Sequence, residues 1–236
     1  MKQLGLGIAM YEQDFDEKTL PGLNPYGTGQ GWAGQAYPYV KSAAVFVCPD
    51  DSGGAEPAVC SYIYNSNVAI AAPNNTGAPD SVTLAQYQSP AKTVLLCEGA
   101  NSYYYTVATE VQDDVQYDGA SPAGYGYGGP TDPQGFNGNN GSQTLKYATG
   151  FMRGSDQANA SFFTGALGRH TGGSNFLMAD NHAKWLRGGS VSAGYSNRVS
   201  PTDCGGEEIY PPKPYLMEAA GTGCSDNTIQ ATFSIE

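Results

Sequence analysis

The stretch that decides the fold is RHTGGSNFLMADNHAKWL, residues 169–186. Two β-rich runs, residues 175–179 and 182–186, flank the dipeptide Asp180-Asn181. A two-residue Asp-Asn connection tolerates positive φ angles, so it favours a tight β-hairpin. The chain is therefore expected to contain an antiparallel sheet with this hairpin in it.

Further elements are expected on both sides of the hairpin. Leu4, Ile8, Tyr11 and Phe15 recur at helical spacing and form one apolar stripe, which predicts a helix over residues 2–16. Periodicity and β-rich composition predict the remaining elements, which are a short helix over 32–42 and strands over 62–64, 92–98, 103–111 and 228–235.

This order of elements predicts a single α+β domain over residues 1–236, with the helix of residues 1–16 packed on an antiparallel sheet. Residues 113–142 are rich in Gly and Tyr and lack periodicity, so they are interpreted as a surface loop insertion. Residues 190–236 are punctuated by Pro and Gly and are expected to form an irregular C-terminal region.

The overall charge excludes one class of partner. The 236 residues carry 11 basic and 22 acidic side chains, a formal net charge of −11. Nucleic-acid binding needs clustered Lys and Arg to neutralise phosphates, so no nucleic-acid partner is expected. No apolar run approaches the length of a membrane span.

The five cysteines indicate an oxidising compartment. Short Gly- and Pro-rich stretches separate Cys48 from Cys60 and Cys204 from Cys224, which predicts two disulfides. Cys97 lies within a buried-strand pattern and is interpreted as a core thiol. Metal binding by these cysteines is disfavoured because the chain has no C-x-x-C pair and only two histidines. An extracellular or cell-surface location follows from the disulfides.

Catalytic residues are not expected, although two arrangements of side chains would suit a hydrolase. His170 with Asp180 as its orienting carboxylate would suit an esterase, although no G-x-S-x-G motif accompanies them. Glu98 would be the acid of a glycoside hydrolase, with Asp50 or Glu110 as second carboxylate. The structural alternative is that His170 and Asp180 bracket the hairpin and that the buried Glu98 pairs with Arg169 or His170.

Calcium is a possible cofactor because carboxylates gather in one loop segment. Oxygen ligands on a flexible loop suit Ca²⁺, although the segment lacks the ligand order of an EF-hand. The candidate ligands are Glu110, Asp113, Asp114 and Asp118.

The tyrosines offer a third type of site. Tyr is amphipathic, so clustered tyrosines would stack on the sugar rings of a polysaccharide or form contacts between subunits. Alternatively the rings pack among themselves. The tyrosines concerned are Tyr103, Tyr104, Tyr105, Tyr117, Tyr125 and Tyr127.

Three stretches together resemble one family. They are KQLGLG with MYEQDFD and LP in residues 2–21, YVKS with VFVCPD and SYIYN in residues 39–65, and the hairpin stretch of residues 169–186. These stretches resemble type IV pilin-like and type II secretion pseudopilin-like proteins with a C-terminal signature of His, nine residues and Asp-Gly. His170 and Asp180 have this spacing, and Asn181 stands where the family has Gly. The resemblance covers about residues 1–105 and 169–187.

The resemblance implies a structural function and a fold. It implies the soluble head of a pilus or pseudopilus subunit, an N-terminal helix packed on an antiparallel sheet, and other pilin or pseudopilin subunits as partners. It also implies an apolar segment upstream of Lys2 that anchors the precursor in a bacterial membrane. Major pseudopilins hold calcium in a C-terminal loop, so the resemblance implies a second set of candidate calcium ligands, which are Asp203, Glu207, Glu208 and Asp226. The alternatives remain a secreted glycoside hydrolase or esterase and a glycan- or surface-binding module.

Overall fold

A computed structural model describes slightly more than half of the chain. The described residues are 1–20, 32–51, 60–65, 68, 82–100, 146–153, 163–192, 194, 202, 204 and 220–235. The expected strand over 103–111 and the expected loop insertion over 113–142 lie outside them.

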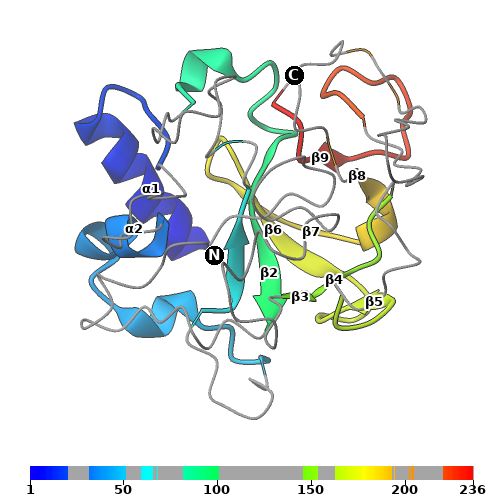
Figure 1. Cartoon of the computed structure of the whole chain (residues 1–236), viewed down its shortest axis with the longest axis horizontal. Coiled ribbons are helices and arrows are strands. Elements are labelled where there is room, and N and C mark those ends of the chain that lie inside the picture. The colour runs from blue at the N-terminus through cyan, green and yellow to red at the C-terminus, as the bar shows by residue number, and fades with distance from the viewer. Residues whose placement is uncertain are drawn as a thin grey trace, which may run out of the picture.

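Two α-helices precede a series of short strands (Figure 1). The elements are, in order, α1 (Lys2–Asp14), α2 (Trp32–Val40), the 3₁₀ turn η1 (Ala43–Phe46), β1 (Tyr62–Tyr64), η2 (Leu84–Gln86), β2 (Val94–Ala100), β3 (Lys146–Tyr147), β4 (Thr149–Gly150), β5 (Leu167–Gly168), β6 (Ser174–Met178), β7 (Ala183–Leu186), η4 (Gly188–Ser190), β8 (Val191–Ser192) and β9 (Ala231–Thr232). The described part of the chain is therefore a mixed α+β fold, as the sequence predicts.

The main sheet is antiparallel and is built around β2. Its strand order is β1-β2-β6-β7, and β3 pairs with the end of β2. Every residue of β2 is buried, as its apolar run VLLCEGA requires. Tyr62 of β1 lies opposite Glu98, and Phe176 of β6 lies opposite Cys97. This register places Glu98 beside two other segments of the chain.

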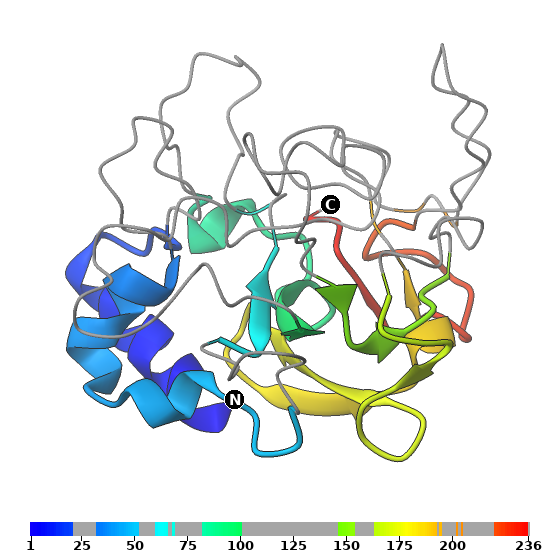
Figure 2. The same cartoon turned by 60° about the horizontal axis from the view of Figure 1, so that its bottom comes forward.

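Both faces of the sheet are covered. Leu96 and Leu177 belong to a core that also contains Leu4 and Ile8 of α1. Phe176 belongs to a second core, which includes residues of β3, β8 and β9. Figures 1 and 2 show the helices on one side of the sheet and β8 and β9 on the other.

The β6–β7 hairpin lies where the sequence predicts a hairpin, but its connection is longer than the predicted two residues. β6 ends at Met178 and β7 begins at Ala183, so four residues lie between the strands. Asn181 adopts a φ of 67°, which Asn tolerates better than most residues. Its side-chain nitrogen Nδ2 also donates a hydrogen bond to Glu12 Oε2 of α1 at 3.1 Å. A Cβ on Gly5 would come within 2.8 Å of the Asn181 carbonyl oxygen, so Gly5 permits the close approach of α1 to the turn.

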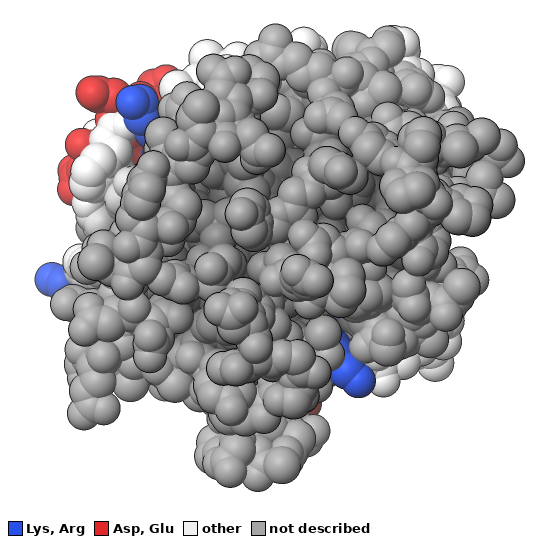
Figure 3. All heavy atoms as spheres, in the orientation of Figure 1, with Lys and Arg blue, Asp and Glu red and all other residues white. Residues whose placement is uncertain are grey.

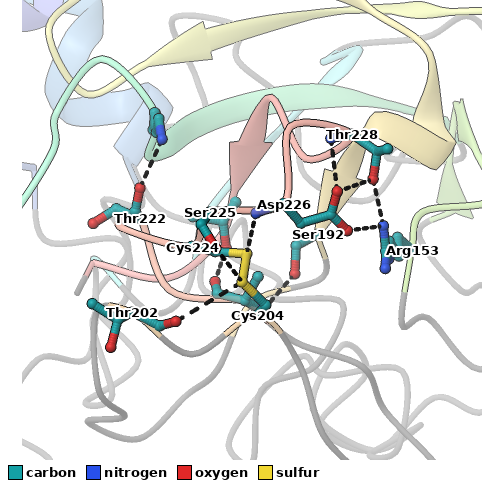
Figure 4. Close-up of a disulfide and its surroundings, with 12 residues drawn as sticks. Arg153, Ser192, Thr202, Cys204, Thr222, Cys224, Ser225, Asp226 and Thr228 are labelled. Carbon is teal, nitrogen blue, oxygen red and sulfur yellow. Dashed lines mark hydrogen bonds and ion pairs between the residues drawn. A yellow bond between two sulfur atoms is a disulfide. The ribbon is translucent and has the colours of Figure 1, made fainter.

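The C-terminal region is cross-linked within itself by a disulfide and tied to the rest of the fold by an ion pair. Cys204 and Cys224 form the predicted disulfide (Figure 4). Beside it, Arg153 pairs with Asp226 at 2.7 Å. The parallel pair β8–β9 is shorter than the strand expected over 228–235.

The second predicted disulfide is wrong. Cys48 and Cys60 are buried reduced thiols, as is Cys97. The Cys60 thiol donates to the Tyr62 carbonyl at 3.4 Å, whereas the Cys48 sulfur lies 3.5 Å from His170 Nε2. The sequence gives only the short separation of the two cysteines, and the fold gives each sulfur a different neighbour.

Acidic side chains gather near the C-terminal end of α1. In Figure 3 the red side chains are seen mainly at the upper left, over the C-terminal end of α1, where Asp14, Asp16 and Glu17 are exposed. None of the helices that the structure describes combines the length and apolar character that crossing a bilayer requires.

Candidate functional site

His170 lies in a tight turn between β5 and β6. The backbone N–H of His170 donates to the Gly173 carbonyl at 2.9 Å, and the Gly173 N–H donates back at 3.1 Å. The two central residues, Thr171 and Gly172, have φ angles of 55° and 81°. A β-branched residue rarely adopts a positive φ, so surrounding contacts must hold Thr171 in place.

Trp185 supplies one of those contacts. Its indole N–H donates to the His170 carbonyl at 2.9 Å. A Cβ on Gly173 would come within 2.4 Å of Trp185 Cζ2, so the ring packs directly on the glycine backbone. The hairpin that decides the fold thus also fixes the position of His170.

A second turn, Cys48-Pro49-Asp50-Asp51, faces the first. The Asp51 N–H donates to the Cys48 carbonyl at 2.9 Å, and proline suits the second position of such a turn. The Cys48 N–H donates to Ser61 Oγ at 2.9 Å, which ties the turn to the residue before β1. The turn therefore presents Cys48 and Asp50 toward the same histidine.

The imidazole of His170 has a partner at each nitrogen. Nδ1 lies 3.0 Å from Asp50 Oδ2. Nε2 lies 2.9 Å from Glu98 Oε1 and 3.5 Å from Cys48 Sγ. The ring thus joins residues that lie far apart in the sequence.

Glu98 is held inside the protein by neutral donors as well. Its side chain is 1% exposed. Ser174 Oγ donates to Oε2 at 2.7 Å, and Asn175 Nδ2 donates to Oε1 at 2.8 Å. These bonds compensate for the burial of the carboxylate and fix its orientation.

An ion pair flanks the cluster. Arg169 Nη2 lies 3.0 Å from Asp51 Oδ2 and donates to the Gly99 carbonyl at 2.6 Å. The cluster and this ion pair together contain three carboxylates, Asp50, Asp51 and Glu98, and one guanidinium, which leaves two formal negative charges when the imidazole is neutral. Burial raises the pKa of Tyr62 well above its usual range, and the neighbouring Cys48 and Glu98 add to the rise.

The sequence-based candidates are distributed unevenly over this geometry. The expected pairing of Glu98 is found, with His170 as its partner. Asp180 does not approach His170, because its carboxylate contacts His182 Nδ1 on the exposed side of the hairpin. The proposed esterase pair is therefore not formed.

The structure describes one of the calcium candidates, Asp226. All of them except Asp226 lie outside the described residues, including Asp113, Asp114, Asp118, Asp203 and Glu207. Asp226 accepts hydrogen bonds from Thr228 and pairs with Arg153 (Figure 4), and these donors lower its pKa. The tyrosines of the third candidate site also lie outside the described residues.

The sequence reasoning missed the part that Cys48 takes in the cluster. The available signal was the Cys-Pro-Asp-Asp turn, which places a thiol and two carboxylates within four residues. Comparison of the chain with family models, curated proteins and solved structures finds no match. The cluster has the side chains for two kinds of chemistry, which are metal binding and activation of a thiol by an imidazole.

Proposed function

We propose that this chain is the head domain of a filament-forming subunit, of the kind found in type IV pili or type II secretion pseudopili, displayed on a bacterial surface. The observation that carries the proposal is the pair of apolar faces on α1. Leu4 and Ile8 are fully buried against the core. Leu6 and Met10, which are 68% and 51% exposed, lie on the opposite face one turn apart.

An outward apolar stripe of this kind suits contact with another copy of the chain. Gly5 and Gly7 lie on the inner face of α1, where the helix backbone closely approaches the β6–β7 turn and Val40. Leu6 and Met10 lie on the opposite face, so they cannot reach the core. Burying the stripe on a different surface of the next copy would give a head-to-tail contact. Such contacts generate open filaments when the rotation does not close a ring.

The resemblance to pilin-like proteins supports the same proposal. It rests on residues that the fold brings together, since α1 contacts the turn of the hairpin that carries the His-x₉-Asp spacing. The proposed arrangement is an N-terminal helix with one face on the head and the other on neighbouring subunits. Other subunits are therefore the partners that this proposal requires.

The hydrolase alternative has less support. Glu98 is buried and already bound by Ser174, Asn175 and His170, so it lacks the access that a glycosidase acid needs. The alternative predicts turnover of a polysaccharide or ester by the purified protein that Glu98→Gln abolishes. The glycan-binding alternative predicts retention on insoluble polysaccharide.

The proposal is tested on filaments sheared from the surface of the native host. Antibodies against this chain should label thin filaments by electron microscopy. The double variant Leu6→Glu/Met10→Glu should reduce labelled filaments at least tenfold, because glutamates desolvated in the contact would lack partners. Both positions are exposed and glutamate is a good helix former, so the head should keep its fold.

Leu167→Glu is the matched control. Leu167 is an apolar side chain on β5 that is 73% exposed and lies away from α1 (Figure 1). Its replacement should leave filament numbers unchanged. Equal loss with both variants, or host filaments that never contain the chain, would contradict the proposal, as would the turnover or glycan binding described above.

A further inference from the structure

Three potential metal ligands converge at the turn that carries His170. The Cys48 sulfur, the His170 imidazole nitrogen and one Glu98 carboxylate oxygen all lie within 4.8 Å of one another. They come from the Cys48–Asp51 turn, from the 170–173 turn and from β2, so the tertiary fold alone brings them together. Cys48 and Glu98 are buried.

We propose that Cys48, Glu98 and His170 bind one Zn²⁺ ion. Zinc bonds of about 2.0–2.3 Å in tetrahedral geometry separate neighbouring ligand atoms by about 3.3–3.6 Å. The observed separations from His170 Nε2 are 3.5 Å to Cys48 Sγ and 2.9 Å to Glu98 Oε1. The third pair, Cys48 Sγ and the Glu98 carboxylate oxygen, lies within 4.8 Å, so these two groups adjust their positions when the ion binds.

The charges around the ring favour a cation at this point. Both nitrogens of His170 face carboxylates, so one of these two contacts needs a positive charge, carried either by the ring or by a bound cation. A metal ion between Nε2 and Glu98 supplies that charge, because Nε2 then donates its lone pair to the ion. The Cys48 thiol releases its proton to solvent when the zinc–sulfur bond forms. Zn²⁺ then offsets two of the three formal negative charges that Arg169 leaves, one of which is the Cys48 thiolate.

The surrounding groups are those that orient zinc ligands. A zinc-bound histidine commonly donates its other N–H to a carboxylate, and here Asp50 Oδ2 lies 3.0 Å from Nδ1. Ser174 and Asn175 orient Glu98 in the same way. Sulfur and imidazole ligands select zinc over calcium, which prefers oxygen alone.

Three protein ligands leave one coordination position for water or a small anion. The cluster is open to solvent beside His170, where Asp50 is 68% exposed and the His170 side chain is 22% exposed. This inference concerns the head domain alone, so it holds whether or not the chain polymerises.

The competing interpretation is a cysteine nucleophile activated by His170 and oriented by Asp50. That mechanism needs Nε2 to be available to the thiol. Glu98 Oε1 is closer to Nε2 than the sulfur is, so Nε2 is shared between the carboxylate and the thiol. A metal ion bound by all three groups fits this arrangement better than a thiol–imidazole pair. The two interpretations also differ in the reactivity of Cys48: a bound zinc ion would protect the thiol from alkylation, whereas an activated nucleophile would remain open to it.

Zinc binding is measured on the chelator-treated protein with a zinc indicator in competition, under a thiol-free reductant. We expect one Zn²⁺ per chain with a Kd below about 1 µM. Cobalt substituted for zinc should give a thiolate-to-metal charge-transfer band that Cys48→Ser removes. His170→Gln should weaken zinc binding at least 100-fold, and Asp50→Asn about 10- to 100-fold.

His182→Gln is the matched control, because His182 also has a carboxylate at Nδ1 but lies on the exposed hairpin. Its zinc affinity should stay within twofold of the unmodified protein. Asp50 is exposed, so Asp50→Asn decides the matter even if a ligand variant fails to fold. Absence of zinc binding, equal effects at both histidines, a cobalt spectrum without the charge-transfer band, or a Cys48–Cys60 bridge in the purified protein would overturn the inference.

Discussion

Glu12 is a carboxyl group buried between α1 and the hairpin turn. It is 3% exposed, and its Oε1 has no hydrogen-bond partner among the described residues. Burial raises its pKa to about 7, although the hydrogen bond from Asn181 acts in the opposite direction. The folded protein therefore favours the protonated form of Glu12 more than the unfolded chain does.

This shift makes stability depend on pH. The stabilisation is complete below pH 4.5, the ordinary pKa of the group, and is lost as pH rises through about 7. The contribution of Glu12 to the free energy of unfolding should fall by about 3 kcal/mol across that window. Urea unfolding at several pH values measures it.

Glu12→Gln separates this effect from other titrations. Glutamine keeps the shape and cannot ionise, so the variant should lack the Glu12 contribution to the decrease between pH 4.5 and 7. Parallel pH profiles for the variant and the unmodified protein would show that Glu12 titrates normally in the fold.

At the scale of elements, Asn181 joins the β6–β7 hairpin to α1. It combines a positive φ with the hydrogen bond to Glu12. Asn181→Ala should destabilise the fold by about 2 kcal/mol, because alanine loses the bond and adopts the left-handed conformation poorly. Asn181→Gly relieves the backbone cost, so its loss should be smaller, about 1 kcal/mol.

Thermal or urea unfolding of both variants gives the comparison. The order alanine below glycine below asparagine is the expected one. A glycine variant as unstable as the alanine variant would mean that the backbone conformation of the turn contributes little. An alanine variant as stable as the unmodified protein would mean that neither the positive φ nor the hydrogen bond to Glu12 contributes to stability.

At the scale of the whole molecule, local patterns predict the elements and tertiary pairing decides the site. Periodicity predicts α1, and the β-rich runs on both sides of Asp180-Asn181 predict β6 and β7, because these signals are contained in short stretches. The contact between His170 and Cys48 depends instead on the pairing of β1 with β2, which brings Ser61 and the Cys48 turn beside Glu98.

The cysteines illustrate the same division. Sequence separation suits both predicted bridges, and only Cys204–Cys224 is formed. Whether two cysteines bond depends on where the fold directs each sulfur, and the direction of Cys48 toward His170 has no local signature. A short separation in the sequence is thus not sufficient for a bridge.

The most direct test of the filament proposal is photo-cross-linking on the native host, with a photoreactive amino acid in place of Leu6 or of Leu167. The account predicts covalent multiples of this chain from position 6 and only single chains from position 167, since α1 faces the next subunit and β5 does not. Surface-displayed protein that yields no multiples from position 6 would contradict the account.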